Sequence, residues 1–178
     1  MLKKLKIVMD KMNSIDYGFI DSDKNIYPDN DEDWDNSFSK LYRLQILNGL
    51  EKTKYGVCWD QVELERYYLN EMGIKSKSYF IVSYDGKIYP THTFIVVNDN
   101  YKYYWLEHSW EPYRGIHEFN DVDELLTDVK SKFIKMCINK GISTNEIVIY
   151  EYVEPVNNLD CLEFFKHCES GKIVNLDK

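Results

Sequence analysis

Apolar residues recur along this chain with two spacings, which distinguish helices from strands. Five segments carry apolar residues three or four positions apart, as an amphipathic helix does. These predicted helices cover residues 2–12, 37–50, 59–72, 121–140 and 159–168. Other segments are rich in β-branched and aromatic residues, which is typical of strands. They cover residues 79–84, 92–97, 101–107 and 147–153.

Short turn-forming stretches separate the predicted strands. Asp85-Gly86 follows the first strand, and Asn98-Asp99-Asn100 follows the second. Connections this short join antiparallel neighbours. A small hairpin is also predicted over residues 17–28, where the turn-rich residues 21–25 lie between two short extended segments. Helices that precede a run of strands favour an α+β fold.

Length and composition are typical of one folded domain, residues 1–178. The chain is 44% hydrophobic and 15% aromatic, so it can bury a core without disulfides. No segment approaches the roughly 18 consecutive apolar residues of a membrane span. Asp10 and Lys11 interrupt the apolar start of the chain, unlike a signal peptide. We therefore expect a cytoplasmic protein without a membrane partner.

The charge of the chain disfavours nucleic acid as a partner. It carries 30 acidic and 22 basic residues, only 3 of them Arg, for a formal net charge of -8. Binding to a phosphate backbone requires a basic surface instead. Residues 21–35 hold seven acidic residues and one Lys, so much of the excess lies in one region. The pattern predicts a local acidic rim rather than an acidic surface throughout.

One of the four cysteines lies where chemistry is expected. The cysteines have no regular spacing, which in a chain without an export signal favours thiols over disulfides. Cys58 comes directly before the predicted helix 59–72. The free N–H groups and positive dipole end of a helix stabilise a thiolate there, and could also hold an oxyanion. Cys58 is the candidate nucleophile, whereas Cys137, Cys161 and Cys168 are predicted to be packing residues.

A cysteine nucleophile needs a base, and His92 is the candidate. In the predicted strand His92 shares a face with Phe94 and Val96. If these two residues are core, we expect that face to lie towards the helix that begins at Cys58, which would offer His92 to the thiol.

The base in turn needs an acceptor that fixes its tautomer, and Glu107 is the candidate. If residues 99–100 form a two-residue hairpin loop, the register puts His92 directly opposite Glu107. A register one residue away would put Leu106 there. The spacing therefore permits a His92–Glu107 pair without requiring it.

Four short motifs then occur in an order that resembles a known family. They are Gly56-Val57-Cys58-Trp59, Glu71-Met72-Gly73-Ile74, Thr91-His92-Thr93-Phe94 and Tyr104-Trp105-Leu106-Glu107. This order resembles the transglutaminase-like superfamily, which shares its core with papain-like cysteine proteases. The resemblance covers residues 55–110, about a third of the chain. In that family the third position is usually Asp, whereas here it is Glu107, followed by His108-Ser109-Trp110.

The resemblance implies a fold and a reaction. The expected fold is α+β with a papain-like core, in which the Cys58 helix packs on an antiparallel sheet. The expected reaction is acyl transfer or hydrolysis at amide bonds of peptides or proteins through a thioester, with Cys58, His92 and Glu107 as catalytic residues. No cofactor and no metal are expected. Hydrolysis is preferred over cross-linking, because water is always present and no dedicated amine site is visible.

Several alternatives stay open at this point. A non-catalytic relative could bind a peptide or protein partner in the same cleft. Trp59 and Trp110 could line that cleft or only pack beside the helix and the sheet, and packing is favoured. His108 and His117 are predicted to be surface or rim residues.

Two groups of residues have spacings that partly fit metal sites, and each has a simpler interpretation. Oxygen-bearing residues at 21, 23, 25, 29 and 32 have the spacing of a calcium loop, but Ile26 stands where that loop needs Gly. An acidic hairpin and loop is favoured. Cys161, His167 and Cys168 offer too few ligands for structural zinc, and Cys161 and Cys168 fit one packed helix face.

Overall fold

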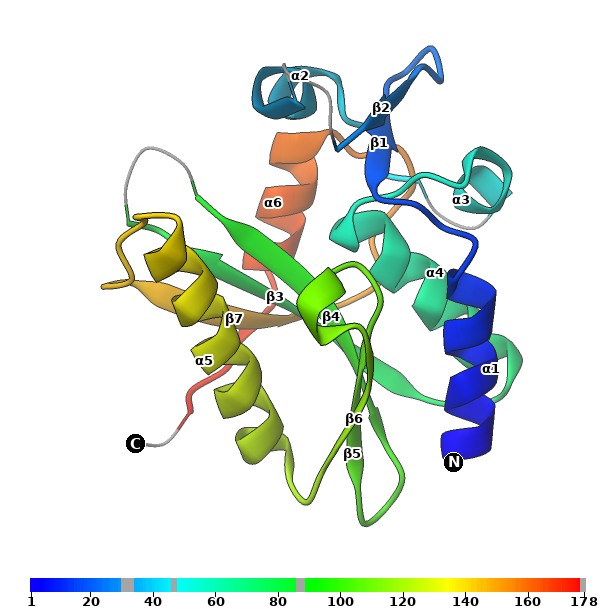
Figure 1. Cartoon of the computed structure of the whole chain (residues 1–178), viewed down its shortest axis with the longest axis vertical. Helices are drawn as coiled ribbons and strands as arrows, with labels where there is room; N and C mark the ends of the chain where they lie inside the picture. The colour runs from blue at the N-terminus through cyan, green and yellow to red at the C-terminus, as the bar shows by residue number, and fades with distance from the viewer. Residues whose placement is uncertain (30–33, 46–47, 86–88, 177–178) are drawn as a thin grey trace.

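An antiparallel sheet with helices on both faces forms the centre of the molecule (Figure 1). The computed structural model describes residues 1–29, 34–45, 48–85 and 89–176. The helices in this part are α1 (Leu2–Met12), α2 (Trp34–Leu41), α3 (Asn48–Thr53), α4 (Cys58–Glu71), α5 (Val122–Asn139) and α6 (Cys161–Glu169), with a 3₁₀ turn, η1 (Glu111–Tyr113). The strands are β1 (Gly18–Ile20), β2 (Ile26–Pro28), β3 (Ser76–Ser83), β4 (Thr91–Asn98), β5 (Tyr103–Glu107), β6 (Gly115–Phe119), β7 (Ile147–Tyr152) and β8 (Lys172–Ile173).

The main sheet has the order β6-β5-β4-β3-β7-β8, and each neighbouring pair is antiparallel. β1 and β2 form the small hairpin predicted near the N-terminus. The expected α+β class with an antiparallel sheet is therefore confirmed. β6 and β8, which the sequence pattern did not predict, extend the two edges of the sheet.

Side chains that alternate along the strands belong to two separate cores. On one face Phe80, Val82 and Ile95 pack with apolar residues of α1, α4 and α6. On the other face Phe94 and Val96 pack with apolar residues of α5. Figure 1 shows this arrangement, with α5 on one side of the sheet and α1, α4 and α6 on the other.

The prediction of one continuous helix over residues 37–50 is wrong. In its place α2 ends at Leu41, and α3 begins at Asn48. Between the two helices the backbone of residues 43–45 bonds to other parts of the chain: Arg43 N–H donates to the Ile20 carbonyl, and Leu44 N–H donates to the Leu159 carbonyl. These tertiary hydrogen bonds replace those of a continuous helix, which periodicity alone cannot detect.

A buried carboxylate holds this connection against the start of α4. Asp60, in the first turn of α4, is fully buried. One of its oxygens accepts hydrogen bonds from the Tyr42 hydroxyl at 3.1 Å and from Gln45 N–H at 2.7 Å. The other accepts from Val57 N–H at 2.9 Å. Asp60 therefore fixes the backbone on both sides of the position where α4 begins.

The predicted helix 59–72 is confirmed as α4 with its start one residue earlier, at Cys58. The helix ends before Gly73, whose φ of +69° is the left-handed conformation that favours glycine after a helix. Gly56 has a different role, because a Cβ atom there would lie 2.6 Å from Leu50 Cδ1. The residue two positions before Cys58 thus allows a close approach of α3 to α4.

The hairpin between β4 and β5 has a longer loop than predicted. Asn98 pairs with Tyr103, so the connection is the four residues 99–102 rather than two. Asp99 N–H donates to the Lys102 carbonyl, and Asn100 adopts a φ of 54°. The register is therefore displaced by two residues from the predicted one. An even displacement keeps every side chain on its predicted face.

Asp60→Ala should lower the free energy of unfolding by about 3 kcal/mol or more, because it leaves three buried donors without an acceptor. Burial raises the pKa of Asp60 to about 7, so urea denaturation is best measured at pH 8, where the carboxylate is ionised. Asp10→Ala, on the exposed side of α1, is the matched control and should change stability by less than about 0.5 kcal/mol. A loss below about 1 kcal/mol for Asp60→Ala would contradict this role.

Candidate active site

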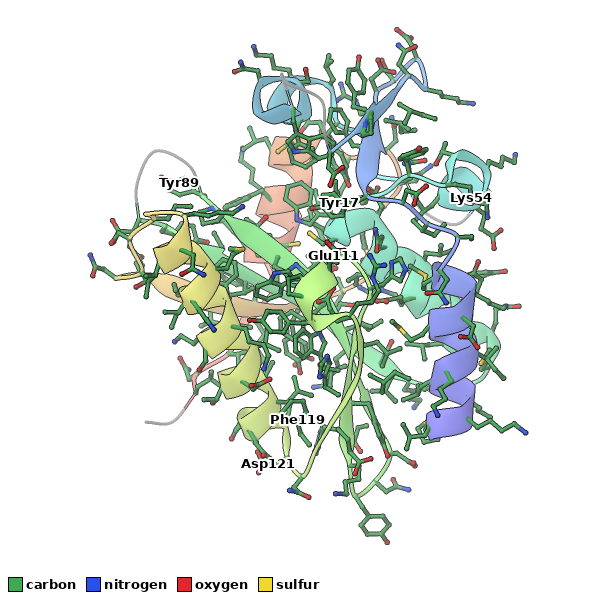
Figure 2. All side chains as sticks on the ribbon, in the orientation of Figure 1. Tyr17, Lys54, Tyr89, Glu111, Phe119 and Asp121 are labelled. Carbon is green, nitrogen blue, oxygen red and sulfur yellow. The ribbon has the colours of Figure 1, made fainter. Side chains whose placement is uncertain are left out.

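A cavity of about 1060 Å³ contains two of the three predicted catalytic residues, Cys58 and His92. Its walls come from the segment before β1, the start of α4, the start of β4, η1 and the end of α5. Figure 2 labels two of its lining residues, Tyr17 and Glu111, near the start of α4. A second cavity of about 920 Å³, between the start of α5 and the C-terminal segment, is lined by no Cys or His among the described residues.

Cys58 is the first residue of α4, as the sequence predicted for a nucleophile. Its side chain is almost buried, with 6% of the residue exposed, yet it lines the cavity. Asp60 uses the N–H group of Val57, the residue before the helix. The N–H group of Cys58, in the first turn of α4, has no helix carbonyl to donate to, and Tyr17 lines the same cavity.

His92 and Glu107 form a buried ion pair beside this thiol. His92 Nε2 lies 2.7 Å from Glu107 Oε2, and the two side chains are 9% and 2% exposed. Because Nε2 is engaged by the carboxylate, Nδ1 is the ring nitrogen that stays available, and His92 lines the same cavity as Cys58. The structure thus brings together Cys58, His92 and Glu107 in the order thiol, imidazole, carboxylate.

The surroundings of this pair favour its charged form. Burial alone would lower the pKa of His92, but the Glu107 carboxylate and the Cys58 side chain outweigh burial and raise it to about 10. Burial alone would raise the pKa of Glu107, but His92 and the hydrogen bonds from Trp110 and Ser109 hold it below its usual value. His92 is therefore an imidazolium and Glu107 a carboxylate at neutral pH.

Glu107 is oriented from the side opposite His92. Its Oε1 accepts hydrogen bonds from Trp110 N–H at 2.7 Å and from the Ser109 hydroxyl at 3.0 Å. The Trp110 ring also lies over His92, with 4.9 Å between ring centroids. The turn that follows β5 therefore fixes both members of the pair. Trp110 lines the cavity, whereas Trp59 packs in the core on Phe164, with ring centroids 4.6 Å apart.

The face of β4 that carries Phe94 and Val96 is covered by a different helix from the one predicted. Phe94 and Val96 are core residues, but they face α5 rather than the Cys58 helix α4. The alternation along a strand assigns residues to a face without identifying the helix that covers it. His92 reaches Cys58 because it lies at the start of β4, where the strand meets the cavity.

His108 is buried, contrary to the prediction of a surface or rim position. It is 3% exposed, and its Nδ1 lies 2.7 Å from Gln61 Oε1. Gln61 Nε2 in turn donates to the Gly56 carbonyl at 2.7 Å, so His108 Nδ1 must be the donor to Gln61. Burial and the positive charge of Arg114 lower the pKa of His108 to about 4, which keeps it neutral. This chain of bonds ties the end of β5 to the segment before Cys58.

Two further groups near the site were missed by sequence reasoning. Glu65 is 2% exposed, and burial with the charge of Glu107 raises its pKa well above the usual value. It lies two helical turns after Cys58, a spacing that puts both on one face of α4. Tyr17, to which sequence reasoning assigned no role, lies against Cys58. No spacing signal could have found it, because 41 residues separate the two.

The remaining candidates have other environments. All four cysteines are free thiols, and Cys137 and Cys168 are buried in the core as predicted. The Asp21 carboxylate accepts hydrogen bonds from Asp23 N–H, Asn25 N–H, the Asn25 side chain and the Tyr27 hydroxyl, so both of its oxygens are used within the β1–β2 hairpin. Glu32, at the twelfth place of that loop, lies outside the described residues.

Within the described ranges, no group of three or more His, Cys, Asp or Glu residues is arranged to hold a metal ion. No helix in the described part of the chain has the length and apolar character needed to cross a membrane. Compared with known proteins, the chain matches no family model, and no curated protein matches it.

Glu107→Gln should destabilise the protein by about 3 kcal/mol at pH 6, because it leaves a buried His92 without its charged partner. An unfolded His loses its proton near pH 6.5, about where a free imidazole does, whereas the folded protein keeps His92 protonated to about pH 10. The pair's contribution is therefore complete below pH 6.5 and is lost as the pH rises towards 10.

The difference in free energy of unfolding between wild type and Glu107→Gln should thus shrink between pH 6 and pH 10 in chemical denaturation. Glu118→Gln, on an exposed part of β6, is the control and should show a small difference at every pH. Equal differences for Glu107→Gln at pH 6 and pH 10 would be incompatible with a charged His92–Glu107 pair.

Proposed function

We propose that the protein is a cysteine-dependent acyl-transfer enzyme that acts on amide bonds of peptides or proteins, most simply as a hydrolase. The observation that carries this proposal is the His92–Glu107 ion pair next to a cysteine at a helix start, in a cavity open to solvent. A thiolate is the reactive form of cysteine, and a neighbouring imidazolium stabilises it.

The mechanism follows from the arrangement of these groups. The Cys58 thiolate attacks the carbonyl carbon, a C–S bond forms, and the carbonyl electron pair moves to oxygen. His92 then gives its proton to the leaving amine as the C–N bond breaks, which leaves a thioester. A water molecule attacks the thioester, His92 takes its proton, and the thiolate leaves. Glu107 keeps His92 oriented and stabilises the imidazolium in both steps.

The sequence motifs support the same reaction class. Their order resembles the transglutaminase-like superfamily, and the α+β fold with a cysteine helix on an antiparallel sheet is compatible with the papain-like core of that family. Glu107 stands where the family usually has Asp. Its longer side chain fits the observed register, because it reaches His92 from a position that is not directly opposite.

The cavity is suited to an extended polypeptide rather than a small molecule. Its volume of about 1060 Å³ is at the upper end of the range for small-ligand pockets, and its lining mixes aromatic, proline and charged residues. We prefer water to an amine as the acceptor, since hydrolysis needs no additional binding site. The protein is proposed to act without a cofactor and in the cytoplasm.

The main rival is a non-catalytic protein that binds a peptide in the same cavity. This rival needs the aromatic wall but not a reactive thiol. The reactivity of Cys58 therefore separates the two functions, and the other cysteines of the chain supply an internal reference. Burial raises the pKa of Cys137, Cys161 and Cys168, that of Cys161 to about 11.

In the enzyme, iodoacetamide at pH 6 should alkylate Cys58 at least about ten-fold faster than an ordinary thiol with a pKa of about 8.5. His92→Ala removes the imidazolium and should abolish that advantage. The rates are measured for each cysteine by peptide mass spectrometry. His167→Ala, which changes a histidine of α6 remote from the cavity, should leave the Cys58 rate unchanged. Ordinary reactivity of Cys58 in the wild type would favour the binding protein and exclude the proposed mechanism.

A further inference from the structure

We propose that the Tyr17 hydroxyl is a catalytic residue that donates a hydrogen bond to the oxyanion, together with the backbone N–H of Cys58; this inference rests on the proposed function. The segment before β1 holds Tyr17 at the wall of the cavity that contains Cys58 and His92. Figure 2 shows Tyr17 next to the start of α4.

The backbone fixes this segment next to the nucleophile. Asp16 forms a parallel bridge with Tyr55, with Asp16 N–H donating to the Lys54 carbonyl at 2.8 Å and Gly56 N–H donating to the Asp16 carbonyl at 3.1 Å. The residue before Tyr17 is therefore bonded to the chain on both sides of residue 55, three residues before Cys58. This attachment holds the residue before Tyr17 next to the segment that leads into α4.

The side chain of Tyr17 lies partly exposed at the wall of the cavity. The residue is 36% exposed, and its ring stacks on Trp34 with centroids 6.1 Å apart. Tyr17 and Cys58 line the same cavity. Burial and the Cys58 side chain raise the pKa of Tyr17 well above its usual value, so the hydroxyl keeps its proton and remains a donor.

These contacts put a neutral donor where negative charge would develop. When a thiolate attacks a carbonyl, the C–S bond forms and the carbonyl electron pair moves to an oxygen that lies within reach of the nucleophile's own N–H. The Tyr17 side chain lines the cavity together with Cys58, and its ring is held on Trp34. As the substrate oxygen accepts a hydrogen bond from the Cys58 N–H, the Tyr17 hydroxyl turns its hydrogen to that oxygen. When the intermediate collapses, the electron pair returns to carbon, and Tyr17 keeps its proton throughout.

Two reagents separate this role from an effect on the thiol. Acylation of Cys58 by p-nitrophenyl acetate passes through an oxyanion, and nitrophenolate release measures its rate. Alkylation by iodoacetamide displaces iodide from a saturated carbon and forms no oxyanion. Tyr17→Phe removes only the hydroxyl and keeps the ring on Trp34. Rates at pH 7 are corrected with Cys58→Ala, and Tyr101→Phe, an 85% exposed tyrosine in the β4–β5 loop, is the matched control.

Tyr17→Phe should slow acylation at least about ten-fold, as expected for a lost oxyanion donor, with alkylation unchanged within about two-fold. Tyr101→Phe should change neither rate. Tyr17→Leu, which also removes the ring, should show the same selective loss, so the conclusion does not depend on one variant.

Equal slowing of both reactions would mean that Tyr17 acts on the reactivity of the Cys58 thiolate, which would overturn the oxyanion role. Faster reaction in Tyr17→Phe would mean that the hydroxyl blocks the site, and unchanged acylation would mean that it does nothing there; both outcomes overturn the proposal. Failure of the proposed function has a different signature, because the wild type would then acylate no faster than Cys58→Ala.

Discussion

The buried carboxylate of Asp60 is the interaction on which the site depends. It accepts hydrogen bonds from three donors. Two lie in the connection between α2 and α3, and the third is the N–H group of the residue before α4. A carboxylate in the first turn is favourable because it faces the positive end of the helix. Since Asp60 engages Val57 N–H, the next N–H group, that of Cys58, is left to face Tyr17 and the cavity. The helix start is thus fixed while its reactive residue stays available.

A second set of bonds brings the sheet to this helix. The Gln61 side chain joins the Gly56 carbonyl to His108 at the end of β5, and Glu107 next to it holds His92. Burial lowers the pKa of His108 and raises that of Glu65, so burial favours the neutral form of both neighbours of the His92–Glu107 pair. His92 lines the same cavity as Cys58 and carries the positive charge of the ion pair, and an imidazolium beside a thiol stabilises a thiolate.

Much of the fold could be predicted from the sequence, and the exceptions have physical causes. The helices at residues 2–12 and near 59–72 and 121–140 have strong periodicity, and the structure contains them as α1, α4 and α5. The predicted helix 37–50 failed because Asp60 and the Leu159 carbonyl bind the backbone between α2 and α3. β6 and β8 are edge strands of five and two residues, and neither carries a run of β-branched and aromatic residues like those of β3 and β4.

Some residues of the site could likewise be identified from the sequence, and others could not. Cys58 and His92 could be found because each is a single reactive residue at a recognisable place, a helix start and a strand. Glu107 was identified although the predicted register was wrong by two residues. A shift of two residues keeps each side chain on the same face of the sheet. Tyr17, Gln61 and His108 could not be assigned, because their roles depend on contacts between segments that only the folded chain brings together.

The central claim is that Cys58 and His92 form a thiolate–imidazolium pair at neutral pH. The most direct test is the ultraviolet absorbance of the thiolate, taken as the difference between wild type and Cys58→Ala across the pH range from about 4 to 9. The account predicts that the thiolate band is already present at pH 6 and that it disappears at this pH in His92→Ala. A band that appears only near pH 8.5, as in an ordinary thiol, and is the same with and without His92 would contradict it.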